Sequence, residues 1–135
     1  MELKIASNVY GHQTVSFFNS YLRRDNDAIY SFEFFCPDGV KAAIGRKQIL
    51  LALDNQRIVG ALRFYKKKSG VISLYQFAID EAYRKQNLLV AMLEMIKVSS
   101  VESLCPINST FNDYYRKSGW SLSGQFKNLN RWTYG

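Results

Sequence analysis

Histidine, cysteine and proline are scarce in this 135-residue chain, which has one histidine, two cysteines and two prolines. Cys36 and Cys105 form neither a Cys-x-x-Cys pair nor a cluster with His12, so the spacing argues against zinc and we expect no metal. We interpret both cysteines as buried thiols. The alternative, Cys36 as a nucleophile, is less favoured because a catalytic cysteine usually needs a histidine base.

Long apolar runs are also missing. The chain has no stretch of about 18 uninterrupted apolar residues, and Met1-Glu2-Leu3-Lys4 lacks the charged-then-apolar order of an export signal. We therefore expect a cytoplasmic protein that does not span a membrane. The sequence has no repeat, low-complexity tract or Pro/Gly/Ser linker, and its length is typical of one domain. A single domain over residues 1–135 is predicted.

Basic residues outnumber acidic ones, because eighteen Lys and Arg stand against eleven Asp and Glu and give a formal net charge of +7. Such a charge attracts polyanions: nucleic acid, an anionic surface or a phosphate-rich cofactor. A basic but otherwise ordinary solvated surface explains the same charge. The run Lys66-Lys67-Lys68 has the same alternatives, with a solvated turn as the default.

The N-terminal third predicts one helix and leaves one stretch ambiguous. His12 to Leu22 carries apolar residues at helical spacing, and Arg23-Arg24 suit a helix C-terminus. From Ile29 to Phe35 the aromatic residues are too dense to separate a helix from a strand; they either line a binding pocket or, more simply, pack in the core. Pro37-Asp38-Gly39 then indicates a turn.

The middle of the chain predicts three antiparallel strands, at Ile49–Leu53, Ile58–Tyr65 and Val71–Ile79, separated by two turns. Both faces of the third strand are largely apolar. We therefore expect this strand to be central in a sheet that is covered on both sides.

After Arg84 the hydrophobic period changes from two to about 3.6, which predicts a helix from Leu88 to about Lys97. The elements predicted after it are a strand, a helix capped by Gly119, and two further strands, at Val101–Cys105, Ser109–Lys117, Trp120–Leu122 and Arg131–Tyr134. The sequence therefore predicts an α+β fold (α/β mixed), a mixed sheet of about six to seven strands with helices on both faces.

This order of elements resembles the fold of the N-acetyltransferase superfamily, GNAT. Phe77 to Arg84, which ends in Tyr83-Arg84, resembles the strand end of the family and its approach to the acyl-CoA loop. Tyr114-Tyr115-Arg116-Lys117-Ser118-Gly119-Trp120 resembles the family pattern Phe-Tyr-x-x-x-Gly-Phe, and Asn108 stands seven residues before Tyr115, where the family often has Asn. The resemblance covers residues from about 49 to 134 and depends on the order and spacing of these motifs.

The resemblance implies a pyrophosphate loop at the start of a helix, where unpaired backbone N–H groups and a partial positive charge favour phosphate. The residues of this loop would be Arg84, Lys85, Gln86, Asn87, Leu88 and Leu89. The family pattern Arg-Gly-x-Gly-x-Gly (last position Gly or Ala) has small residues where this chain has Lys85, Asn87 and Leu89, so the loop is degenerate. Leu89 either crowds the pyrophosphate or points into the core with Leu88 and leaves the amides usable.

The resemblance also implies a path for the acyl arm of the cofactor. The backbone of Phe77, Ala78 and Ile79 would pair with the pantetheine amides as an added strand would. Asn108 would bind the same arm.

Catalysis needs an oxyanion donor and an acid for the leaving thiolate. The resemblance makes Tyr115 the candidate acid and Tyr114 its fallback, although core packing explains either tyrosine equally well. A general base is harder to identify. Ser73 occupies the position where some relatives carry Glu, Glu33 is a weak substitute, and ordered water can take the proton in their place.

Two hypotheses follow. The first is an enzyme that transfers an acyl group, most simply acetyl from acetyl-CoA, directly to a primary amine in a ternary complex. The second is a binding module of the same fold that uses its basic surface for nucleic acid or a protein partner. A hybrid, in which nucleic acid or aminoacyl-tRNA carries the acceptor amine, combines the two. The sequence does not choose among these, nor between a monomer and a homodimer.

Overall fold

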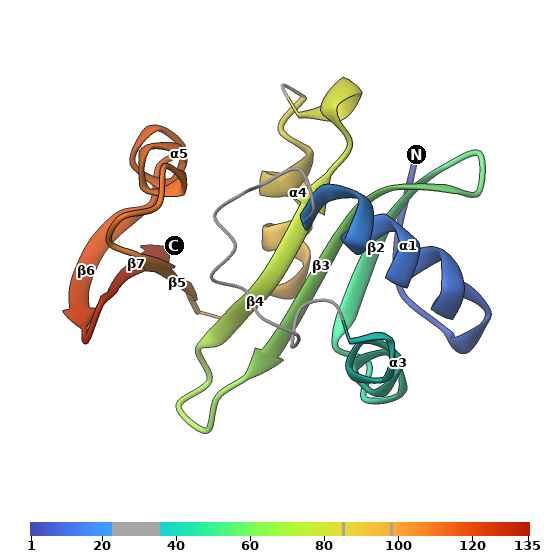
Figure 1. Cartoon of the computed structure of the whole chain (residues 1–135), viewed down its shortest axis with the longest axis horizontal. Helices are drawn as coiled ribbons and strands as arrows, with labels where there is room; N and C mark the ends of the chain where they lie inside the picture. Colours follow the sequence, from blue (N-terminus) through green and yellow to red (C-terminus); the bar gives the residue numbers. More distant parts are fainter. Residues whose placement is uncertain (23–35, 85, 98) are drawn as a thin grey trace. The chain divides into compact units, whose positions relative to one another are not determined.

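The computed structural model describes residues 1–22, 36–84, 86–97 and 99–135 (Figure 1). The chain divides into two compact units. The first unit comprises Met1–Phe64 and Gln76–Met95, and the second unit comprises Tyr65–Tyr75 and Ile96–Gly135. Within the described ranges, no helix is long and apolar enough to cross a membrane.

The described residues contain seven strands, which pair in the order β1-β2-β3-β4-β5-β7-β6 (Figure 1). Their bounds are Glu2–Ile5 (β1), Ile49–Asp54 (β2), Arg57–Lys66 (β3), Ile72–Ile79 (β4), Val101–Pro106 (β5), Ser121–Phe126 (β6) and Leu129–Tyr134 (β7). The β4–β5 pair is parallel, whereas the β1–β2, β2–β3, β5–β7 and β6–β7 pairs are antiparallel. The predicted α+β class and the central position of β4 are confirmed.

The β2–β3 hairpin of the first unit turns through Asn55 and Gln56, whose φ angles are 50° and 66°. Two residues with positive φ are what a tight hairpin turn requires. The register of the hairpin shifts between Ala52 and Leu53, so that Leu53 faces Ile58 and Ala52 faces Gly60.

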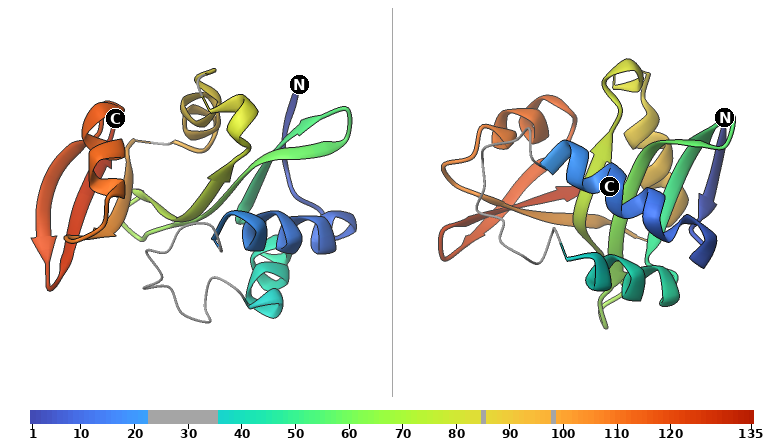
Figure 2. Two further views of the ribbon diagram at one scale, coloured as in Figure 1. Left: turned by 45° about the horizontal axis from the view of Figure 1, so that its top comes forward. Right: turned by 45° about the vertical axis from the view of Figure 1, so that its right-hand side comes forward.

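Two helices of the first unit, α1 (Gly11–Leu22) and α3 (Pro37–Gly45), pack on one face of its strands (Figure 2). Their buried side chains form one core cluster with Leu51, Ile58 and Ala78 from three strands. The turn predicted at Pro37-Asp38-Gly39 is wrong, because these residues are the first turn of α3. Proline near the first helical position and an acidic residue in the first turn both favour a helix start.

Helix α4 (Leu88–Ile96) covers the opposite face of the same strands (Figure 2). A Cβ atom on Gly60 of β3 would lie 3.1 Å from Ile79 Cδ1 and 3.2 Å from Met92 Sδ, so the helix approaches the strand closely at this glycine. The apolar face predicted for this helix is buried, as expected.

In the second unit, β7 pairs with β5 on one side and with β6 on the other, and the first half of β4 pairs with β5 in parallel. Helix α5 (Phe111–Lys117) ends before Gly119, whose φ of 86° suits the glycine cap predicted there. The last two strands are longer than predicted and form a hairpin.

The two cysteines differ in exposure. Cys105 on β5 is buried, as predicted, but Cys36 is exposed at the position before the first residue of α3. The expectation that both thiols are buried is therefore wrong for Cys36, because a helix N-cap lies at the surface end of its helix. The ambiguous stretch 29–35, including Glu33, lies outside the described residues.

Candidate functional site

The segment after β4 is anchored to the β2–β3 hairpin at two points. Asp80 accepts a hydrogen bond from the Ala82 amide at 3.0 Å, which caps the short 3-10 helix Glu81–Tyr83, and it pairs with Arg57 at 3.3 Å. The bond from the Ala82 amide, with help from Arg57, lowers the pKa of Asp80 below its usual value. The Tyr83 hydroxyl donates to Asp54 at the end of β2. These contacts fix the approach to the predicted pyrophosphate loop.

Arg84 folds back onto the end of β4. Its Nε donates to the carbonyl oxygen of Ile79 at 3.0 Å, and its guanidinium lies over the ring of Tyr21 on α1, 5.7 Å from the centroid. The Tyr-Arg pair that suggested the family resemblance therefore has a structural role here, since both side chains tie the loop to the strands and to α1.

Asn87 has a φ of 58°, the left-handed conformation, and α4 begins at the next residue. Asn adopts this conformation more readily than other residues with a side chain, so it reproduces at this position the backbone shape that glycine gives. The first N–H groups of a helix have no partner within the helix, and here they belong to Leu88 and its neighbours. The loop thus presents backbone amides at the positive end of α4.

Leu89 is the third position at which the family pattern has a small residue. It is 8% exposed and Leu88 is 6% exposed, so both side chains lie in the core. Of the two orientations expected for Leu89, the structure has the one in the core with Leu88. Lys85 lies outside the described residues, and Gln86 donates from its side chain to the Ala82 carbonyl at 3.2 Å.

The strand that precedes this loop contains a buried polar residue that sequence reasoning missed. Gln76 is 6% exposed, and its Oε1 accepts a hydrogen bond from Arg63 Nη1 of β3 at 3.2 Å. Within the described ranges, its Nε2 atom has no hydrogen-bond partner. The signal in the sequence was a single amide among apolar residues of a central strand.

A cavity of about 370 Å³ opens in the first unit beside α1. Polar side chains from α1, the ring of Phe17 and the start of β3 line it together with Asp80, and the full lining is Gln13, Ser16, Phe17, Ser20, Tyr21, Arg57, Ile58 and Asp80. Asp80, whose pKa is lowered by its hydrogen bond from the Ala82 amide, gives this wall a negative charge at neutral pH.

The two candidate acids lie on α5 in the second unit. Tyr115 is 4% exposed, its ring stacks on Trp132 with centroids 5.7 Å apart, and its hydroxyl shares a hydrogen bond of 2.8 Å with Ser103. Tyr114 is half-buried, and burial raises its pKa above the usual value. The Tyr114 hydroxyl therefore stays protonated at neutral pH, as an acid must.

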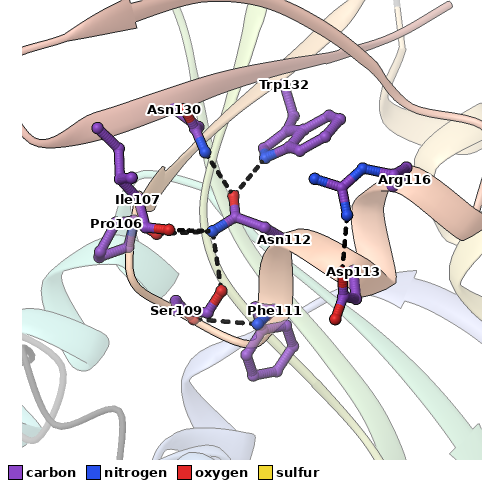
Figure 3. Close-up of polar contacts among 9 residues, drawn as sticks. All are labelled: Pro106, Ile107, Ser109, Phe111, Asn112, Asp113, Arg116, Asn130 and Trp132. Carbon is purple, nitrogen blue, oxygen red and sulfur yellow. Dashed lines mark hydrogen bonds and ion pairs between the residues drawn. The ribbon is translucent and has the colours of Figure 1, made fainter.

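Asn108 is exposed on the loop between β5 and α5, and the adjacent buried Asn112 holds this loop in place (Figure 3). The Asn112 amide nitrogen donates to three carbonyl oxygens of the loop, and its oxygen accepts from two side chains of β7. The five partners are Pro106 at 2.8 Å, Ile107 at 3.1 Å, Ser109 at 2.8 Å, Asn130 at 2.9 Å and Trp132 at 2.9 Å. Sequence reasoning also missed this network.

The predicted site residues thus fall into two groups. Those of β4 and the loop, from Phe77 to Leu89, lie together in the first unit, with Ala78 and Ile79 buried and Phe77 half-buried. Asn108 and Tyr115 lie in the second unit. Over the described part of the chain, no cluster of three His, Cys, Asp or Glu side chains suits a metal ion.

The strand order, with a loop and helix directly after the central strand, defines an α+β protein with a mixed sheet. More specifically, this is the GNAT fold, as comparison with solved structures shows. No family model matches the sequence, and no curated protein matches it. The fold implied by the resemblance is therefore confirmed by structure alone.

Three solved structures illustrate the similarity. The PaiA N-acetyltransferase of Thermoplasma acidophilum in complex with coenzyme A has a TM-score of 0.78 and 12% identity, over 98% of this chain and 96% of that one. A GNAT-family acetyltransferase of Listeria monocytogenes has a TM-score of 0.73 and 13% identity, over 98% and 93%. The GNAT-like decarboxylase GphF with isobutyryl-CoA has a TM-score of 0.71 and 10% identity, over 100% and 99%. At such identities, the likeness concerns the fold.

Proposed function

We propose that this protein is an acyl-CoA-dependent N-acyltransferase that moves an acetyl group from acetyl-CoA to a primary amine. The observation that carries the proposal is the loop before α4. Its left-handed Asn87 and its core-facing Leu89 support a loop whose amides can bind a pyrophosphate, although the glycines of the family pattern are missing. The PaiA enzyme and GphF, which share this fold, have coenzyme A and isobutyryl-CoA bound in their structures.

In this proposal the loop binds the diphosphate of the cofactor. The amides at the start of α4 donate to phosphate oxygens. The family resemblance gives Lys85, which lies outside the described residues, the role of adding positive charge to the loop. The Arg84 guanidinium uses one N–H on the Ile79 carbonyl and keeps others for the phosphate. The backbone of Phe77, Ala78 and Ile79 and the side chain of Asn108 hold the pantetheine arm.

Transfer is direct, in a ternary complex and without an acyl-enzyme. The lone pair of the neutral amine forms a C–N bond at the thioester carbonyl, and a tetrahedral oxyanion results. The C–S bond then breaks, and the thiolate takes a proton from the Tyr115 hydroxyl, with Tyr114 as the fallback donor. The proton that the attacking nitrogen loses passes through ordered water and restores the tyrosine hydroxyl. Ser103, which already shares a hydrogen bond with Tyr115, orients that hydroxyl.

Thermal unfolding with acetyl-CoA tests the proposal. A ligand at 100 times its dissociation constant adds about 2.7 kcal/mol to the free energy of unfolding, which is several degrees for a chain of this size. Pantetheine, which lacks the phosphates, is the matched control and should shift the transition much less. An unchanged melting temperature at millimolar acetyl-CoA would overturn the proposal.

A further inference from the structure

The Gln76 side chain is unusual because it is buried with half of its hydrogen-bonding capacity unused. It lies on β4 between Leu74 and Ala78, on the strand face that α1 and α3 cover. An arginine side chain only donates, so the amide oxygen of Gln76 must face Arg63 and the Nε2 group must point elsewhere. Within the described ranges this Nε2 atom, with its two N–H donors, meets no acceptor.

Folding alone does not explain such a residue. Buried polar groups in native proteins are nearly always paired, and an apolar side chain of similar volume would fill the same space without losing hydrogen bonds to water. The Gln76 amide therefore fits a site in which a ligand supplies the acceptor atom.

The charge around Gln76 indicates which acceptor would fit. The Arg63 guanidinium lies beside the first turn of α3, where a Cβ on Gly39 would be 3.6 Å from Nη2. A helix N-terminus carries partial positive charge, so a cation and the positive end of a helix lie next to the Gln76 amide. Asp38, exposed in the same turn, offsets part of this charge, and Arg63 has further interactions of its own. The surroundings favour an anionic oxygen over a neutral one.

The position of Gln76 on β4 places the Gln76–Arg63 pair next to the proposed path of the acyl arm. Gln76 directly precedes Phe77–Ile79, the backbone to which the acyl arm is assigned. An anion bound at Gln76 would thus belong to the acceptor molecule, whose amine must reach the thioester.

We propose that Gln76 and Arg63 bind a carboxylate of the acceptor, so that the substrate is an amine that also carries a carboxylate, as a free amino acid does. This inference rests on the proposed N-acyltransferase function. A carboxylate has two oxygens, and it matches the amide N–H2 of Gln76 on one side and the guanidinium on the other.

Matched pairs of amines test the proposal. The common amino acids, β-alanine and 4-aminobutyrate would each be compared with the corresponding amide as acceptors for acetyl-CoA, with rates corrected for the fraction of free amine. We expect the best acid to exceed its amide at least about tenfold in kcat/KM, a factor equivalent to about 1.4 kcal/mol. Equal or faster transfer to the amides would overturn the proposal.

Two variants test whether Gln76 and Arg63 cause the preference for the acid over its amide. Gln76→Glu replaces the amide donor by a carboxylate that pairs with Arg63 and repels the substrate, so the acid preference should disappear. Arg63→Met should reduce it. The matched controls, Gln56→Glu in the exposed hairpin turn and Arg46→Met at the exposed end of α3, should leave it unchanged. An acid preference that survives in Gln76→Glu, with the fold intact by circular dichroism, contradicts the assignment.

A binding measurement separates this proposal from the proposed function. If no amine is acetylated, the acyltransferase proposal fails, and the carboxylate site is then judged by thermal unfolding with the acids and amides alone. Stabilisation by an acid but not its amide, lost in Gln76→Leu, supports the site. Stabilisation by neither compound overturns it. Gln76→Leu removes the buried amide but also the acceptor of the Arg63 hydrogen bond, so the melting temperature of the variant without ligand is the baseline for this comparison.

Discussion

Single residues decide whether the degenerate loop remains usable, and Asn87 is the first of them. A β-branched residue is strained in the left-handed conformation, whereas glycine is not. Asn87→Val should therefore lower the free energy of unfolding by about 1–3 kcal/mol and weaken acetyl-CoA binding. Asn87→Gly should bind acetyl-CoA at least as well as the parent. Denaturant unfolding and calorimetric titration measure both effects, and Asn128→Val in the exposed β6–β7 turn is the control.

The role of the Tyr115 hydroxyl can be separated from its packing. Tyr115→Phe removes both the proposed acid and the hydrogen bond to Ser103, whereas Ser103→Ala removes only the bond. Each change should cost about 1 kcal/mol of stability. Only Tyr115→Phe should abolish most turnover, with the pH profile of kcat as the readout. Equal turnover in Tyr115→Phe and the parent across the pH range would remove Tyr115 from the mechanism and leave Tyr114 to be tested.

The direction of the Leu89 side chain was not predictable from the sequence. The sequence showed that Leu88 and Leu89 lie next to each other on a helix. Which side of the first turn faces the sheet depends on how the helix packs on the strands, which it approaches closely at Gly60. The missing partner of Gln76 Nε2 among the described residues was likewise not predictable from the sequence. The alternation along β4 shows on which face of the sheet a residue lies, but it does not show which side chains contact it there.

At the scale of elements, the Asn112 network holds the β5–α5 loop. Asn112→Ala leaves two β7 donors and three loop carbonyls without this partner, so the free energy of unfolding should fall by about 1–3 kcal/mol or more. Asn108→Ala, on the same loop but exposed, is the matched comparison. It should leave stability nearly unchanged and weaken acetyl-CoA binding. If instead the two variants unfold alike, the network does not hold the loop.

The cap at Asp80 should show a pH dependence. Its pKa is lower in the folded chain than the usual 3.8, so its contribution is complete above that value and is lost as the pH falls through the folded pKa. Asp80→Ala should cost about 1 kcal/mol at pH 7 and less at pH 2 to 3. Urea unfolding of parent and variant at several pH values measures this. A difference that grows in acid would contradict the assignment.

The elements themselves were largely readable from the pattern. Strands β2 to β5 and helices α1, α4 and α5 fall close to their predicted ranges, because burial on one or both faces leaves a strong period in the sequence. Strand β1 was missed because it has only four residues. Helix α3 was missed because proline, aspartate and glycine mark a turn and a helix start equally well. Strand β6 was predicted too short because nearly all its side chains are exposed.

At the scale of the whole molecule, the net charge of +7 predicts that binding of the proposed anionic cofactor depends on salt. Acetyl-CoA is a polyanion, and attraction between exposed charges is screened over about 8 Å at physiological salt. The dissociation constant of acetyl-CoA should therefore rise several-fold between about 0.05 and 0.5 M NaCl. The affinity for pantetheine, which carries no phosphate, should change little. Equal salt dependence of the two ligands would show that phosphate contacts do not contribute.

Gly60 links the strands of the first unit to the loop, because a substitution there would move α4 and so alter cofactor binding. The glycine has no space for a methyl group unless Met92 or Ile79 moves by a few tenths of an ångström. Met92 belongs to α4, whose first residues carry the amides proposed for phosphate. A larger side chain at position 60 would thus push α4 away from β3. Gly60→Ala and Gly60→Val would therefore shift the start of α4, and with it the loop amides, by increasing amounts without substituting any loop residue.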